Sequence, residues 1–154
     1  CKMALRTHSS TAVEKYSQEA ADKCVPLDSE LIKEAIPLFT QIHHCGSVLA
    51  EVFFAMMISR ILYGSVPAPG TMVIFSILLA TCSIGTPGLP WGTVMVSLGT
   101  LTGILKFGDS GVALMFAVFA LNDAFAAACN ATCDGAAALF LTGYVKRHDF
   151  SNRL

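Results

Sequence analysis

The sequence predicts an all-α membrane protein whose transmembrane helices are broken by stretches of non-helical chain. Hydrophobic residues make up 54% of the 154 positions and charged residues only 14%. The mean hydropathy of +0.62 is too high for an ordinary soluble domain. In addition, glycine, proline and polar residues interrupt the long apolar segments near their middles. A bilayer is therefore the expected solvent for most of the chain.

The few charged groups of the chain are segregated toward its two ends. Between positions 36 and 145, the acidic and basic residues other than His are Glu51, Arg60, Lys106, Asp109, Asp123 and Asp134. The net charge of −1 and the lack of a basic run exclude a nucleic-acid-binding surface. The six cysteines form no CxxC pair, so we expect unpaired thiols. The chain starts with Cys inside a structural segment, which suggests a piece of a longer protein.

The first half of the chain predicts two segments. Residues 1–25 contain a hydroxyl-rich cluster followed by an exposed helix. Residues 26–63 begin with a turn and a helix N-cap at Ser29 and continue as a long apolar helix. Pro37, the polar run at 41–44 and Gly46 interrupt this helix, so we expect a broken transmembrane helix.

The second half predicts a hairpin and a final span. After a turn-rich connector at 64–70, residues 71–107 form two apolar arms around SIGTPGLPWG. Each arm is shorter than the ~20 residues that a helix needs to cross a bilayer, which favours a re-entrant hairpin. Residues 108–145 are long enough to cross, and residues 146–154 form a tail with basic residues.

The positive charges predict that both ends face the cytoplasm. Lysines precede the first span, and Lys146, Arg147 and Arg153 follow the last one. An even number of crossings is then required. Two full spans flanking a re-entrant hairpin satisfy this requirement, and four short spans do so as well.

The interruptions predict a binding site at membrane depth. Hydrocarbon offers no hydrogen-bond partner, so non-helical backbone persists there only when it is buried in protein or lines a watery cavity. Two such breaks occur, HHCG at 43–46 and GTPGLP at 85–90. Ends of broken helices hold anionic groups and cations near the midplane in secondary transporters.

The final span carries a polar stripe. Helical spacing places five residues on one face, namely Asp123, Ala126, Ala127, Asn130 and Asp134. Carboxylates inside a membrane are costly, so the two Asp residues are candidates for function. The alternative is that they are structural and bond to neighbouring helices.

Four collinear motifs resemble those of the dicarboxylate/amino acid:cation symporter family, which includes the glutamate transporters. SIGTPGLP at 83–90 resembles the tip of that family's second re-entrant hairpin, and NATCD at 130–134 resembles its last-helix motif NVTGD. RTHSST at 6–11 resembles the tip of the first hairpin, and PLFTQIHHCGS at 37–47 resembles the broken seventh helix. The resemblance extends over nearly the whole chain.

The resemblance implies a partial transport domain with two re-entrant helical hairpins. Residues 1–25 would be part of the first hairpin and residues 71–107 the second. The hairpins would act as gates, and the site would face each side in turn as this domain moves against a scaffold. The intact protein would be a multi-pass cell-membrane protein and a homotrimer.

The resemblance also implies roles for the substrate-binding residues. Ser10 and Thr11 would contact the substrate's α-carboxylate, although a helix cap is the alternative role. The backbone at Gly88 and Leu89 would close the opposite side. Asp123 would hold the α-amino group through a charge-assisted hydrogen bond, with Asn130 on the same face.

One departure from the family pattern predicts a neutral substrate. The family's arginine for an acidic side chain is replaced by Ala126, and the neighbouring threonine by Ala127. A second substrate carboxylate would then be left unpaired in a low-dielectric pocket, at a cost of several kcal/mol. We therefore expect a small neutral amino acid.

Sodium and protons are the expected coupling ions. By resemblance, Asn130 and Asp134 match one sodium site, and the carbonyls of Ser83, Ile84 and Thr86 match another, with the hard oxygen ligands that sodium prefers. The family's NMDGT is His43 to Ser47 here, with Cys45 in place of the Asp, which puts a third site in doubt.

Glu51 is a candidate proton carrier. It lies one turn beyond Ser47, where proton-coupled relatives keep an acid. A buried lone carboxyl suits that role, whereas pairing with Arg60 would abolish it.

Three other classes of function fit the sequence less well. His43, His44 and Cys45, joined by Cys129 and Cys133, are possible soft-metal ligands in a membrane metal-binding protein. A degenerate homologue acting as a non-transporting receptor or structural subunit is another alternative. No nucleophile, base and orienting group occur at a recognisable spacing, so we do not expect an enzyme.

Overall fold

The computed structural model describes residues 2–9, 11–24, 29–86 and 91–148, and every regular element within them is helical. The elements are α1 (Lys2–Thr7), the 3-10 helix η1 (Thr11–Val13), α2 (Glu14–Asp22), α3 (Ser29–Ile42), α4 (Cys45–Tyr63), α5 (Pro69–Ile84), α6 (Gly92–Val96), α7 (Leu98–Gly103) and α8 (Asp109–Arg147). The predicted all-α class is therefore confirmed for these residues.

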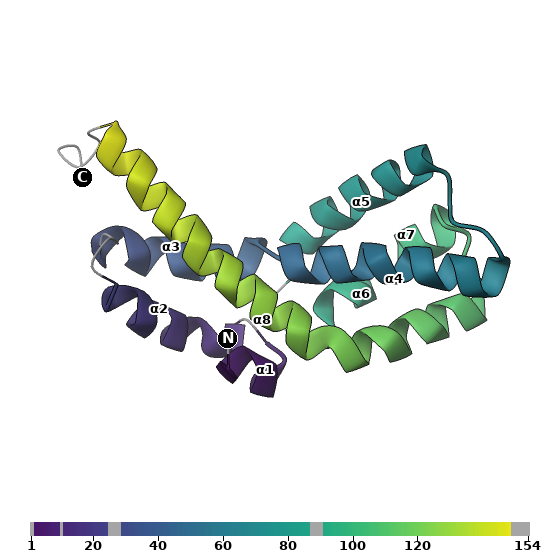
Figure 1. Ribbon diagram of the computed structural model, residues 1–154, viewed down its shortest axis with the longest axis horizontal. Coiled ribbons are helices and arrows are strands. Elements are labelled where there is room, and N and C mark those ends of the chain that lie inside the picture. Colours follow the sequence, from purple (N-terminus) through teal and green to yellow (C-terminus); the bar gives the residue numbers. More distant parts are fainter. Residues whose placement is uncertain (1, 10, 25–28, 87–90, 149–154) are drawn as a thin grey trace.

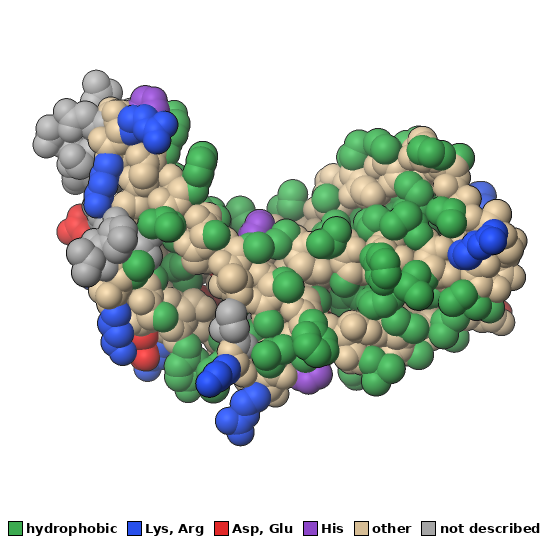
Figure 2. Space-filling view, viewed as in Figure 1, with side chains coloured by type: hydrophobic (Ala, Val, Ile, Leu, Met, Phe, Trp, Pro, Cys, Tyr) green, Lys and Arg blue, Asp and Glu red, His purple; other side chains and the backbone are tan. Residues whose placement is uncertain are grey.

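Within the described residues, two helical segments are long and apolar enough to cross a membrane. They are Glu30–Tyr63, with 34 residues, and Asp109–Arg147, with 39 residues, while Pro69–Ile84 is apolar but shorter. Large hydrophobic side chains on both segments are exposed, including Leu49, Leu121 and Phe140. Figure 2 shows such side chains spread over the half of the molecule formed by α4 to α7 and the start of α8. This surface suits lipid better than water.

The helix α8 organises the molecule. It runs along the length of the fold, with α4 beside its first half and α1 to α3 beside its second half (Figure 1). The main core lies between α4, α5, α7 and α8, where Ile58, Phe75, Leu101 and Phe119 are buried. A smaller core joins α2, α3 and the later part of α8 through Ala21, Ile32, Ile36 and Ala138.

Pro37 lies inside α3 without ending it. Proline lacks the N–H group that would bond the carbonyl four residues earlier, which belongs to Lys33. The side-chain amide of Gln18 on α2 donates to this carbonyl over 3.3 Å. Because a neighbouring helix supplies the missing donor, α3 continues for a further turn beyond Pro37.

The chain instead leaves the helix at His43 and His44. The helix α3 ends at Ile42, His44 has non-helical backbone angles of φ −110° and ψ 38°, and α4 starts at Cys45. Immediately after this break, Gly46 lies against α8. A Cβ atom on Gly46 would come within 2.6 Å of both the Ala126 carbonyl oxygen and the Cys129 Cβ. The glycine therefore permits the close approach of α4 and α8.

The second arm of the segment at 71–107 is divided, whereas the sequence predicts one continuous arm. The helices α6 and α7 meet at Ser97, which is fully buried. Its hydroxyl donates to the Val94 carbonyl over 3.0 Å, and the Thr100 hydroxyl donates to the Ser97 carbonyl over 2.7 Å. Side-chain hydroxyls that bond nearby carbonyls compete with the regular helix ladder, which accounts for the division.

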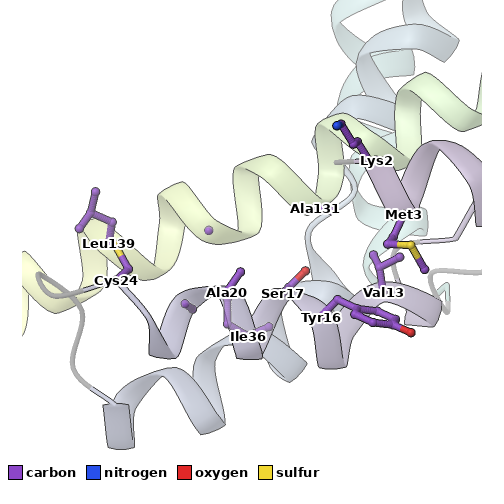
Figure 3. Close-up of a pocket in the computed structure, with 12 residues that line it drawn as sticks. Lys2, Met3, Val13, Tyr16, Ser17, Ala20, Cys24, Ile36, Ala131 and Leu139 are labelled. Atoms are coloured by element: carbon purple, nitrogen blue, oxygen red, sulfur yellow. The ribbon is translucent and has the colours of Figure 1, made fainter.

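A groove lies where α1, α2 and α3 meet the second half of α8. Figure 3 shows Lys2 and Met3 of α1, Tyr16 and Ala20 of α2, and Ala131 of α8 around it. Its volume is about 390 Å³. Small side chains on both walls leave this space open, and it lies apart from the break at His43 and His44.

The close approach at Gly46 leads to a first prediction. Gly46→Ala should lower the free energy of unfolding by roughly 1–3 kcal/mol, because the added methyl overpacks the contact with α8. Thermal unfolding of the purified protein measures the change.

Gly143→Ala is the matched control. Gly143 lies on α8, and a Cβ atom added there would meet no atom of another helix within 4 Å. This substitution should therefore leave the unfolding temperature unchanged or slightly higher. An equal loss of stability in both variants would contradict the proposed contact.

Candidate functional site

The polar stripe of α8 faces the interior of the protein. Asp123, Asn130 and Asp134 are 5%, 2% and 1% exposed, respectively, and Ala126 and Ala127 between them are also buried. Helical spacing places these residues on one face of α8, and the other helices pack over that face. The bundle around it thus excludes these groups from the lipid-exposed surface.

Asn130 caps the start of α4 at the helix break. Its side-chain oxygen accepts hydrogen bonds from the N–H groups of Gly46 at 2.8 Å and Ser47 at 3.4 Å. Its amide nitrogen donates to the Ser47 hydroxyl over 3.0 Å. The first N–H groups of any helix lack intrahelical partners, and here a side chain from α8 supplies one. The break and the stripe are therefore a single polar unit.

Asp134 contacts the end of α3 on the other side of the break. His43 lies 3.1 Å from one carboxylate oxygen through Nδ1, and the Thr40 hydroxyl lies 3.5 Å from the other. Because an ionised carboxylate only accepts hydrogen bonds, this pair forms with the His43 tautomer that carries the hydrogen on Nδ1. One oxygen of this buried carboxylate thus pairs with His43, and the other lies near the Thr40 hydroxyl, which donates its hydrogen to the Ile36 carbonyl at 2.8 Å.

Asp123 lies where the two other non-helical regions meet α8. The backbone N–H of Trp91 donates to its carboxylate over 3.3 Å, and His8 is close enough to interact with it electrostatically. Trp91 and His8 both have left-handed backbone conformations, with φ values of 61° and 55°. Such conformations cost non-glycine residues about 1–3 kcal/mol and cluster at functional sites.

The carboxyl end of α5 lies beside the break. A cavity of about 490 Å³ is lined by His43 and His44 on one side and by Ser83 and Ile84 on the other. Ser83 and Thr86 are buried, whereas Ile84 is exposed. The Ser83 carbonyl accepts the N–H of Thr86 over 3.1 Å. Carbonyl groups at a helix C-terminus carry partial negative charge, which suits a cation.

For some predicted site residues, the structure gives no contact that supports a role. Ser10, Gly88 and Leu89 lie outside the residues that the structure describes, as do Pro87 and Pro90. Thr11 is exposed at the start of η1.

Sequence reasoning missed three contributors to the site: Thr40, His8 and the backbone of Trp91. Each contacts or approaches an α8 carboxylate from a distant part of the chain. The contact between Thr40 and Asp134, for example, joins residues 94 positions apart. No local sequence pattern signals such pairs.

The soft-metal alternative receives no structural support. Among the described residues, no group of three or more His, Cys, Asp or Glu side chains is arranged to hold a metal ion. The Cys45 thiol does lie against the Cys133 thiol, but adjacent residues at the break do not converge with them on one point.

Glu51 is isolated in the interior of the protein. It is fully buried on α4, and neither carboxylate oxygen has a hydrogen-bond partner among the described residues. Ser97 lies nearby, but its hydroxyl donates to the Val94 carbonyl instead. Arg60, the alternative partner expected from the sequence, is exposed and donates to the Gly64 carbonyl. The carboxyl therefore has no counter-ion from Arg60.

A comparison with protein families identifies the group to which the chain is related. The family model described as "Sodium:dicarboxylate symporter family" matches residues 1–143. The chain belongs to the sodium:dicarboxylate symporter family. No curated protein matches the chain in a separate comparison. Membership in this family indicates a symporter-type membrane transporter with a small-molecule substrate, and it implies sodium coupling in general.

The two sodium sites that the family resemblance implies differ in how well their residues fit the ion. At the end of α5, Ser83 and Thr86 are buried and Ser83 lines a cavity, so this region offers oxygen ligands that suit a hard cation. At Asp134 the chemistry of the carboxylate also fits. There, however, His43 and Thr40 already face both oxygens, so a cation would have to share or replace these contacts.

The capping role of Asn130 leads to a second prediction. Asn130→Ala leaves the buried N–H groups of Gly46 and Ser47 without their acceptor, which should reduce the free energy of unfolding by about 1–3 kcal/mol. Thermal unfolding of the purified protein provides the measurement.

Asn122→Ala is the matched control on the same helix. The Asn122 amide donates to the Val118 carbonyl within α8, so its loss should change stability much less. If both variants lost the same stability, the cap would not be the reason.

Proposed function

We propose that this chain is the substrate-binding part of a symporter that carries a small neutral amino acid, coupled to sodium, protons or both. The observation that supports this function best is the position of Asp123. Its buried carboxylate lies where Trp91 and the region of His8 approach α8. A solute held there would touch both of these regions and α8.

Asp123 has the properties needed to bind an amino group. The carboxylate is 5% exposed and receives one backbone hydrogen bond, from Trp91. A carboxylate has room for about four hydrogen bonds, so acceptor capacity remains for an ammonium group. In a site shielded from water, such a charge-assisted bond is strong.

The neighbouring face of α8 favours a neutral side chain. One turn after Asp123, Ala126 and Ala127 are buried and supply no positive charge. A substrate with a second carboxylate would lack a partner from these positions, at a cost of several kcal/mol. A small apolar or hydroxyl side chain fits this surface without that cost.

The proposed gates are the two hairpins at 1–25 and 71–107. The chain turns sharply at His8 and Trp91, both in left-handed conformations and both close to Asp123. Movement of either tip would open the site toward one side of the membrane. Alternating access then follows if this domain moves against a scaffold in a trimeric, multi-pass protein.

The proposed cation ligands are the carbonyls of Ser83, Ile84 and Thr86, together with Asn130 and Asp134. The end of α5 and the break at His43 and His44 line one cavity, so these two regions border the same space. Bound cations would offset the negative charge that Asp134 and a substrate carboxylate bring into a low-dielectric region.

Glu51 is the proposed proton carrier. Burying an ionised carboxylate without a partner costs several kcal/mol. The side chain therefore needs a proton whenever no other positive charge accompanies it. Its burial and the separate contact of Arg60 support this role.

A second candidate function is that of a non-transporting receptor of the same fold. Cys45 stands where the family pattern has Asp and lies against Cys133, so one cation ligand is missing. A receptor would bind the amino acid but not accumulate it in vesicles.

Substrate choice provides a third prediction. The intact protein, reconstituted in vesicles, should take up labelled serine or alanine at least about tenfold better than glutamate, because Ala126 offers glutamate no partner. Ala126→Arg should shift the preference toward glutamate or aspartate, whereas Ala126→Leu adds bulk without charge and should not. Asp123→Asn should abolish binding of both classes.

Equal binding of glutamate and serine by the unaltered protein would contradict the proposed substrate class. Binding without accumulation under imposed sodium and proton gradients would favour the receptor function.

Proton coupling provides a fourth prediction. Glu51→Gln keeps the shape of the side chain but removes its ability to gain and lose a proton. Uptake by this variant should lose its dependence on an imposed proton gradient, while amino acid binding persists. An unchanged profile of transport against pH would rule out Glu51 as the carrier.

A further inference from the structure

His43 contacts one carboxylate oxygen of Asp134, which is one of the proposed cation ligands. The imidazole Nδ1 lies 3.1 Å from Oδ1 of Asp134. This is the geometry of a hydrogen bond to a charged acceptor, which is stronger than one between neutral groups. The protein itself therefore partly satisfies this carboxylate.

We infer that His43 is a specificity-determining residue that competes with sodium for Asp134 and so weakens sodium binding at this site. The inference rests on the proposed function, in which Asp134 is a cation ligand. Sodium requires several oxygen ligands with lone pairs directed at it. An oxygen that accepts the Nδ1 hydrogen has one lone pair fewer to offer, and the hydrogen occupies space that the ion needs.

The two residues differ in how firmly they are held. The side chain of His43 is 34% exposed, whereas that of Asp134 is 1% exposed. His43 belongs to the non-helical link between α3 and α4, and it lines the cavity of about 490 Å³ next to Ser83. The imidazole therefore has room to turn away, while the carboxylate is fixed on α8. His43 has the freedom that a displaceable partner needs.

The contact between His43 and Asp134 is not required to hold α4 against α8. Asn130, one turn away on α8, already bonds the N–H groups of Gly46 and Ser47 and the Ser47 hydroxyl. The Thr40 hydroxyl bonds the Ile36 carbonyl at 2.8 Å and lies farther from Asp134, at 3.5 Å. Of the two α3-side partners, His43 makes the stronger contact. Removal of His43 should therefore free Asp134 without separating α8 from α4.

Direct sodium binding to the purified intact protein tests the inference. His43→Phe keeps a flat ring but cannot donate a hydrogen bond, so the dissociation constant for radiolabelled sodium should fall by about tenfold or more. His43→Ala adds no bulk and should show the same change if the Phe variant does not fold. His43→Asn retains a donor at a similar position and should remain close to the unaltered protein.

Two control variants separate competition from a general structural effect. Thr40→Val removes the weaker contact and should change sodium affinity by less than about twofold. In an Asp134→Asn background, His43→Phe should have no effect on sodium binding, because the shared ligand is gone. The sodium-induced rise in unfolding temperature should likewise be larger in His43→Phe than in the unaltered protein.

The outcomes distinguish the inference from the function on which it rests. If the unaltered protein binds sodium and His43→Phe leaves the affinity unchanged or weaker, competition by His43 is wrong. If neither the unaltered protein nor any His43 variant binds sodium, the sodium coupling proposed above is wrong.

Discussion

The break between α3 and α4 creates the main constraint on this structure. A helix that starts inside the protein exposes N–H groups that have no intrahelical partner, and neither lipid nor apolar side chains can bond them. Asn130 on α8 provides the acceptor for Gly46 and Ser47. The close contact at Gly46 makes this possible, since any Cβ atom there would meet α8 within 2.6 Å. The cap and the close contact thus depend on each other.

This constraint places the chemistry of the site on a single helix. Once Asn130 lies at the break, Asp123 lies two turns before it and Asp134 one turn after it on the same face. The two carboxylates then meet different parts of the chain. Asp123 faces the turn at Trp91 and the region of His8, and Asp134 faces the end of α3. The proposed substrate and cation functions are thereby separated by about three turns along α8.

The three buried carboxylates differ in how their charge is compensated. Asp134 has the His43 imidazole at one oxygen, Asp123 has one backbone donor, and Glu51 has no donor among the described residues. In a low-dielectric interior, an uncompensated carboxylate must acquire a proton or a cation, and a partly compensated one retains capacity to bind a ligand. These differences are consistent with the proposed roles of Asp134 as cation ligand, Asp123 as substrate ligand and Glu51 as proton carrier.

Sequence by itself determined the helical membrane class, the interruption at HHCG and the common face of Asp123, Asn130 and Asp134. These features depend on composition and helical spacing, which are local properties. The tertiary structure decided that Pro37 lies within a continuous helix, because Gln18 of α2 bonds the carbonyl that proline leaves free. It also decided the partners of each carboxylate and the separation of Arg60 from Glu51. Such contacts depend on which distant segments pack together, and the pattern of neighbouring residues does not predict that packing.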